Sequence, residues 1–155
     1  MGLRVLANFL APGTGTALDI RTGSGFTVRL DGPAQGSGSG PGPREMVLGA
    51  LAGCTALDVS SILGKKRQPP ATYEIAVEAD ASVDHPQVFT AVRVEHRVSG
   101  DVEPDALRRA VELSATRYCP VSAMLAKAVA IEHRYHLERP GWPHQDALVV
   151  VTGPA

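Results

Sequence analysis

The sequence predicts an α+β protein with mainly antiparallel sheets, because strand-like and helix-like segments fall into separate groups along the chain. Three short strand-like segments come first and a long helix-like segment follows. Two strands, two helices and a final strand then complete the order. Glycine-rich breaks at residues 13–15 and 23–25 separate the first three strands, as in a meander of hairpins. Because 155 residues suit one hydrophobic core, we expect a single domain over residues 1–155.

The expected strands are marked by apolar–polar alternation or by short apolar runs between turn signals. They cover residues 3–10, 16–21, 26–31, 72–82, 89–98 and 131–137. Strand side chains alternate between faces, so His133 and His136 should point to opposite sides of the last strand. Residues 138–155 give no clear pattern, and we expect them to form an additional C-terminal tail.

A Gly/Ser/Pro tract at residues 32–43 predicts a flexible loop, and the longest helix follows it at about residues 43–65. The small residues Gly49 and Gly53 lie in the middle of this helix, close to Cys54. Each glycine costs about 1 kcal/mol relative to alanine, which suggests close approach of another helix or strand. We therefore expect a central helix that is buried on nearly every side. Because one chain of this length is too short to cover the helix alone, we also expect an intertwined dimer.

Charge and hydropathy exclude several classes of function. Fifteen basic and sixteen acidic side chains nearly cancel, so no net field attracts nucleic acid or an anionic membrane. The longest apolar run, at residues 47–57, is well short of the roughly 20 residues that span a bilayer. We expect a cytoplasmic protein without a cofactor, whose partner is a small, neutral or apolar molecule.

The two cysteines lie in different local contexts. Cys119 directly precedes Pro120, which can occupy the first position of a helix, so the thiol should cap that helix. Free backbone N–H groups and the nearby Arg117 predict that Cys119 is the more acidic thiol. Cys54 lies in the middle of a helix and needs a charged partner from elsewhere in the fold. Asp58, one turn later on the same face, discourages a thiolate unless it is paired or turned away.

In a reducing compartment such cysteines are inert core residues, part of a metal site, or a redox pair. A Cys2His2 zinc site would need His133 and His136 together, and their opposite directions argue against it, so we expect no metal. The other histidines, His85, His96 and His144, are expected in loops or on exposed strand faces. The sequence contains no nucleophile elbow, which argues against a hydrolase.

Two segments, PGPREMVLGALAGCTALDVSSIL and PDALRRAVELSATRYCPVSAMLAKAV, with the order of strands around them, resemble the OsmC/Ohr family over roughly residues 3–137. The resemblance implies an OsmC-like fold in an intertwined homodimer, with two active sites at the interface. It also implies a cysteine-based peroxidase that reduces organic hydroperoxides and is itself reduced by a dithiol.

The same resemblance implies individual roles. Cys54 would be the peroxidatic thiolate that becomes a sulfenic acid, and Cys119 would resolve it to a disulfide, the reverse of what helix capping suggests. Family peroxidases pair the thiolate with an arginine from the N-terminal hairpins and a glutamate that opens the central helix. Arg21 and Glu45 match these residues, although Glu45 is one position nearer to the cysteine. The segment CTALDV, with Asp58, is more similar to a less characterised branch, which keeps open a redox-sensing or small-molecule-binding dimer without efficient turnover.

Overall fold

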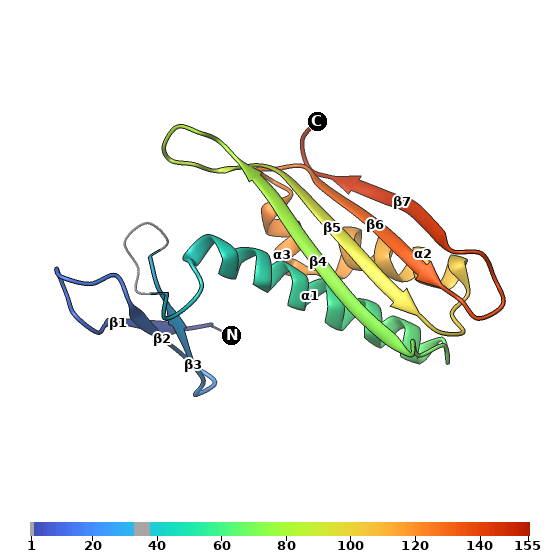
Figure 1. The fold of residues 1–155 in the computed structure, drawn as a ribbon, viewed down its shortest axis with the longest axis horizontal. Helices are drawn as coiled ribbons and strands as arrows, with labels where there is room; N and C mark the ends of the chain where they lie inside the picture. Colours follow the sequence, from blue (N-terminus) through green and yellow to red (C-terminus); the bar gives the residue numbers. More distant parts are fainter. Residues whose placement is uncertain (1, 33–37) are drawn as a thin grey trace. The chain divides into compact units, whose positions relative to one another are not determined.

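The computed structural model of the protein describes residues 2–32 and 38–155, so the middle of the loop expected at 32–43 lies outside the described residues. The chain forms two compact units, residues 1–47 and 48–155, each with its own sheet (Figure 1). The long helix α1, Pro43–Lys65, begins in the first unit and runs through the second, with the bounds that the sequence predicts.

The first unit is built on a three-stranded antiparallel sheet. Its strands β1 (Val5–Phe9), β2 (Leu18–Thr22) and β3 (Thr27–Leu30) pair in chain order. The meander of hairpins expected from the glycine-rich breaks is therefore confirmed.

The second unit carries a four-stranded sheet in the order β4-β5-β6-β7. Its strands are β4 (Thr72–Ala81), β5 (Phe89–Ser99), β6 (Ile131–Glu138) and β7 (Gln145–Thr152). The pair β5–β6 is parallel, because two helices cross between these strands, and the other pairs are antiparallel. Strand β7 lies in the expected tail and pairs along β6. The sequence did not reveal it because the run Leu148–Val151 does not alternate.

Helices cover one face of this sheet (Figure 1). After β5 come α2 (Pro104–Leu113), a π-helical turn η1 (Ser114–Tyr118) and α3 (Pro120–Leu125). The sequence predicts one regular helix as far as about Arg117. Instead, the hydrogen bonding widens at Ser114, so that the Cys119 N–H donates to the Ser114 carbonyl at 3.0 Å. Such π turns insert one extra residue into a helix and are frequent at functional sites.

One stripe of α1 is buried, and its members follow each other at intervals of four: Leu51, Thr55, Val59 and Leu63. Leu51 packs with Val92 and Val94 of β5. Val59 and Leu63 belong to a second cluster, which they form with residues of α2. The rest of α1 is not buried on every side, contrary to expectation: Leu57 is 75% exposed. A Cβ on Gly49 or Gly53 would meet no atom of residues 48–155 within 4 Å beyond its own stretch of helix, so neither glycine serves a close approach within this unit.

The length and composition of α1 would also suffice for crossing a membrane, although its longest apolar run is short. A core helix of a soluble protein has the same properties, and the buried stripe against β5 and α2 is the contact that such a helix makes.

Two buried histidines lie side by side in the core beneath the helices. His96 of β5 and His133 of β6 are fully buried and stacked, with ring centroids 5.9 Å apart, and the Tyr73 hydroxyl lies 2.7 Å from His96 Nδ1. The expectation that His96 is exposed was wrong, because it shares the inward face of β5 with Val94 and Val98. Loss of hydration disfavours the imidazolium, so burial lowers the pKa of His96 to about 3 and that of His133 to about 4.

These two histidines should make the protein acid-labile. Both bind a proton in the unfolded chain below pH about 6.5 but stay neutral in the folded core, so unfolding takes up protons. The free energy of unfolding should therefore fall as pH drops from about 6.5 towards 4, by up to about 1.4 kcal/mol per pH unit for each histidine. Urea denaturation across this range measures the slope.

In the variant His133→Leu, the free energy of unfolding should depend less steeply on pH than in the wild type. His85→Leu, at an exposed position, should show the same pH dependence as the wild type. Equal slopes for wild type and His133→Leu would show that the buried imidazole does not stay neutral in the folded protein.

Candidate redox site

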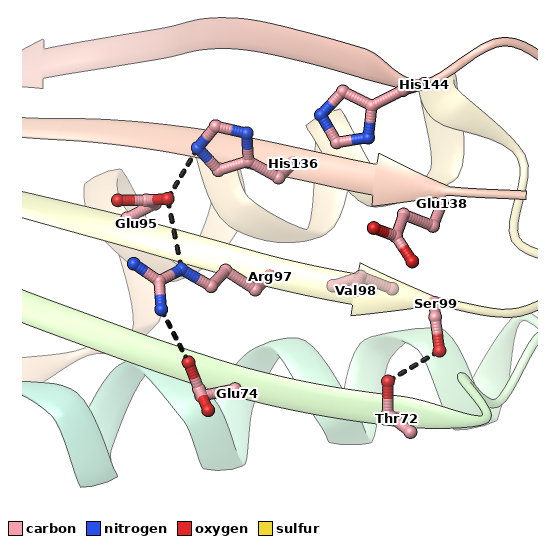
Figure 2. A pocket seen from close by; sticks show the side chains of 9 residues that line it. All are labelled: Thr72, Glu74, Glu95, Arg97, Val98, Ser99, His136, Glu138 and His144. Atoms are coloured by element: carbon pink, nitrogen blue, oxygen red, sulfur yellow. Dashed lines mark hydrogen bonds and ion pairs between the residues drawn. The ribbon is translucent and has the colours of Figure 1, made fainter.

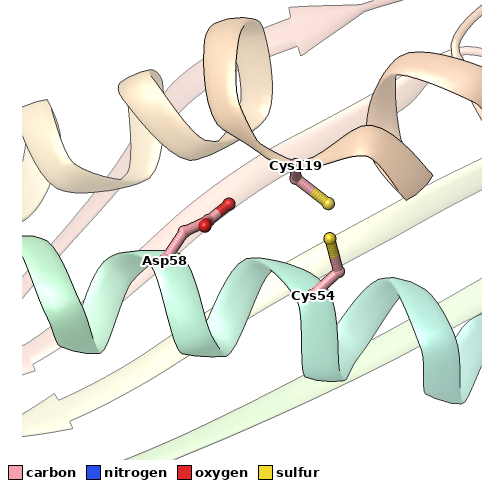
Figure 3. Close-up of side chains that lie close together, drawn as sticks. All are labelled: Cys54, Asp58 and Cys119. Carbon is pink, nitrogen blue, oxygen red and sulfur yellow. The ribbon is translucent and has the colours of Figure 1, made fainter. Parts of the chain in front are cut away.

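Helix α1 presents Cys54 and Asp58 on one side. The two residues are four apart, which places them one turn from each other on the same face, as the sequence predicts (Figure 3). Cys54 is half-buried and Cys119, which faces it from the loop between η1 and α3, is buried. The Cys54 thiol is thus the more accessible of the two.

Cys119 is the N-cap of α3, as expected. Its backbone is extended, Pro120 follows at the first helical position, and the Cys119 Sγ accepts a hydrogen bond from the Ser122 N–H at 3.3 Å. Pro120 favours a helix start at this point, because proline has no N–H and the first residue of a helix does not need one for a hydrogen bond within the helix. The cap holds the Cys119 sulfur at the end of α3 that faces α1.

The fold brings the two cysteines together. Their Sγ atoms and a carboxylate oxygen of Asp58 all lie within 4.8 Å of one another, and both thiols are free (Figure 3). In the figure the two sulfur atoms point towards each other, across the gap between α1 and the start of α3. The pair is therefore placed so that a small movement could join the two sulfurs.

A buried hydrogen-bonded group next to the thiols fixes this arrangement. The Ser114 hydroxyl donates to Asp58 Oδ2 at 3.0 Å and lies 2.9 Å from Thr55 Oγ1. Because the serine has a single hydroxyl proton, which goes to the carboxylate, Thr55 must be the donor to Ser114. The same Ser114 supplies the carbonyl that binds the Cys119 N–H. One residue thus connects α1 to the backbone of Cys119.

Burial controls the ionisation of Cys119. It lies in an apolar cluster with Leu51, Val94 and Ile131, and loss of hydration, together with the neighbouring Cys54 thiol, raises the pKa of Cys119 to about 12. The Ser122 N–H acts in the opposite direction but more weakly. Burial thus opposes the acidifying effect that helix capping predicts for Cys119. Arg117, the expected helper, is exposed and stacks on the Tyr118 ring at 5.6 Å.

Arg21 and Glu45 lie in the other unit. Arg21 is exposed on β2, opposite Leu6 of β1. Glu45 lies in the first turn of α1, where its Oε2 accepts the Gly42 N–H at 2.7 Å. Their pairing with Cys54 stays a prediction. The residues that the sequence interpretation missed are Thr55 and Ser114, two hydroxyl side chains on otherwise apolar helix faces.

A second group of ionisable side chains lies on the outer face of the sheet, around a hollow of about 400 Å³ (Figure 2). As expected, His136 points to this face while His133 points to the core. Arg97 binds Glu74 at 2.7 Å and Glu95 at 3.1 Å, and Glu95 also binds His136. These side chains form an ion-pair network on the solvent-facing side of the sheet.

Comparison with known proteins matches this fold and these motifs. A family model described as OsmC-like protein matches residues 36–134. Protein YhfA of Escherichia coli strain K12 is 41% identical over 115 residues, which are 74% of this chain and 84% of that protein. YhfA of Shigella flexneri matches to the same extent.

Solved structures of the same fold cover most of the chain. An OsmC-like protein from Mycoplasma pneumoniae has a TM-score of 0.76 at 15% identity and covers 89% of this chain and 98% of its own. The organic hydroperoxide resistance protein OhrB of Bacillus subtilis has a TM-score of 0.62 at 17% identity, with coverage of 90% and 98%. The OsmC-like fold that the sequence predicts is therefore confirmed, and the chain belongs to the OsmC-like protein family.

Proposed function

We propose that the protein is a thiol peroxidase that reduces organic hydroperoxides through Cys54 and Cys119. The observation that carries this proposal is the convergence of two free thiols, one half-buried and one buried, at the contact of α1 with the start of α3. The name of the Bacillus subtilis protein refers to organic hydroperoxides, and its likeness to this chain is one of fold. The support for the proposed activity therefore comes from the two thiols and not from the comparison.

The chemistry assigns different tasks to the two sulfurs. The Cys54 thiolate attacks the terminal oxygen of the hydroperoxide, the O–O bond breaks, and the alkoxide takes up a proton to leave as an alcohol. Cys54 is then a sulfenic acid. The Cys119 sulfur attacks the Cys54 sulfur, and the hydroxyl group leaves as water with the proton from Cys119. An external dithiol reduces the resulting disulfide by two thiol–disulfide exchanges.

The raised pKa of Cys119 makes it a poor first nucleophile for peroxide, which leaves that role to Cys54. To resolve the sulfenic acid, Cys119 gives up its proton, and the leaving hydroxyl group takes that proton up. We assign the activation of Cys54 to Arg21, with Glu45 as the residue that orients the guanidinium. An arginine beside Cys54 would favour the thiolate and offset Asp58.

Asp58 also supports a second candidate function, a redox-sensing or small-molecule-binding protein with little turnover. Its carboxylate lies near both thiols and disfavours a second negative charge beside it. In that case the pair would oxidise slowly, and the protein would take up an apolar small molecule in a saturable way.

One equivalent of cumene hydroperoxide should convert the reduced protein to an intramolecular disulfide. Intact-mass analysis should show the loss of two hydrogens, and peptide mapping should join Cys54 to Cys119. Cys54→Ser should lose the reaction, whereas Cys119→Ser should stop at a sulfenic acid that dimedone traps. If wild-type thiols survive excess hydroperoxide, the protein is not a peroxidase.

Alkylation should distinguish the two thiols. Iodoacetamide reacts with thiolates, so at pH 8 the buried Cys119, with its raised pKa, should be alkylated much more slowly than the half-buried Cys54. Peptide mass spectrometry over a time course measures both rates in the same sample. Faster alkylation of Cys119 would assign the first attack on peroxide to that residue.

We also propose that the protein is a homodimer in which a second copy covers the exposed side of α1. Proteins of the OsmC/Ohr family are commonly homodimers. The exposed side carries Leu57, and Gly49 and Gly53 have open space around them within residues 48–155, which leaves room for a second backbone at close range.

Replacement of Leu57 by lysine should therefore weaken the dimer. A charge in an apolar interface loses hydration, so light scattering should give the dimer mass for wild type and a lower mass for Leu57→Lys at equal concentration. Val83→Lys, at an 89% exposed loop position, serves as the matched control and should remain dimeric. A wild-type monomer would contradict the proposal.

A further inference from the structure

We propose that the reduced cluster of Cys54, Asp58 and Cys119 is a binding site for a thiophilic divalent cation such as Zn²⁺, and that the metal and the disulfide exclude each other. This proposal goes beyond the peroxidase function. It depends on the geometry of the cluster, and it holds whether or not the cluster reduces hydroperoxides.

The three donors have the composition and spacing of a metal site. Two thiols and a carboxylate oxygen lie within 4.8 Å of one another. In tetrahedral zinc with Zn–S bonds of about 2.3 Å, two sulfur ligands lie about 3.8 Å apart. Small rotations of the Cys54 and Asp58 side chains, which project from the same face of α1, can close the remaining difference. The fourth position would be open to water or another ligand.

Surrounding hydrogen bonds already orient two of the three donors. The Ser114 hydroxyl donates to Asp58 Oδ2, and Thr55 in turn donates to Ser114. No described residue forms a hydrogen bond with the other carboxylate oxygen, which remains available to a metal. The Cys119 sulfur accepts the Ser122 N–H. Metal sites commonly depend on such supporting bonds, whose loss costs about 10–100-fold in metal affinity.

The charge of the cluster suits a cation. Asp58 is an acceptor from Ser114, and within the described part of residues 48–155 no cationic side chain forms an ion pair with it. Ionising a thiol beside this carboxylate brings two negative charges together in an apolar surrounding. A divalent cation removes that penalty because its two positive charges take the place of both thiol protons, so the thiolates form without adding net negative charge beside the carboxylate. Thiolate ligands select zinc over magnesium or calcium.

Metal binding and oxidation then compete for the same sulfur atoms. Binding converts Zn²⁺ and two thiols into a zinc dithiolate and releases two protons. A Cys54–Cys119 disulfide contains neither thiolate, so it retains only the carboxylate of the three donors. Bound metal, conversely, occupies the sulfur that would attack a hydroperoxide. The cluster would therefore bind metal only in its reduced state.

Competition with a chromogenic chelator tests the proposal on the reduced, metal-free full chain. Wild type should bind one Zn²⁺ per chain and release about two protons per ion in weakly buffered solution. Asp58→Asn should bind Zn²⁺ at least about tenfold more weakly. Co²⁺ as a probe should give a thiolate-to-cobalt charge-transfer band in wild type. Asp146→Asn, which alters the surface group of His136, His144 and Asp146, should bind like wild type.

The wild-type chain itself provides a control that needs no variant. After oxidation with diamide, which forms the disulfide without a hydroperoxide, zinc binding at this site should disappear and should return on reduction. Zinc binding that survives oxidation, that follows Asp146 instead of Asp58, or that releases no protons would overturn the proposal. A chain that binds zinc as described but resists hydroperoxide would overturn the peroxidase function alone.

Discussion

The side chain and carbonyl of Ser114 connect the two halves of the cysteine site, and the rest of the site depends on this connection. The hydroxyl binds Asp58 and Thr55 on α1, and the carbonyl receives the Cys119 N–H across the π turn. A regular α-helix would use a different carbonyl for that N–H and would rotate the residues that follow. The extra residue of η1 thus determines where α3 begins and which side of it faces Cys54.

Burial and helix capping act on the Cys119 thiol in opposite directions. The Cys119 sulfur has the N-cap position and the Ser122 N–H, yet its apolar surroundings raise the pKa of the thiol. The half-buried Cys54 faces it beside an anionic side chain. Such a pair has one accessible sulfur, one protonated sulfur and one carboxylate. That set of groups suits stepwise oxidation, and it also suits a cation that replaces both thiol protons.

Much of this could be predicted from sequence, because local signals determined it. Pro43 and Pro120 mark helix starts, and alternation marks β4, β5 and β6, so their bounds were found within a few residues. The pairing of Cys54 with Cys119 came from the resemblance to the OsmC/Ohr family. Burial could not be predicted in the same way: His96 looks like a surface residue until strand register places it inward, and the π turn at Ser114 has no local signature. Strand β7 lacks alternation and gains its place through pairing with β6.

We propose that Cys54 and Cys119 form one redox unit. A redox titration tests it most directly: the reduced protein is equilibrated with mixtures of reduced and oxidised glutathione, and the trapped species are counted by mass spectrometry. We expect a single two-electron transition to a Cys54–Cys119 disulfide, with little mixed disulfide, because the facing thiol resolves the mixed disulfide. Glutathione that remains attached to Cys54 while Cys119 stays reduced would show that the two cysteines do not act as one unit.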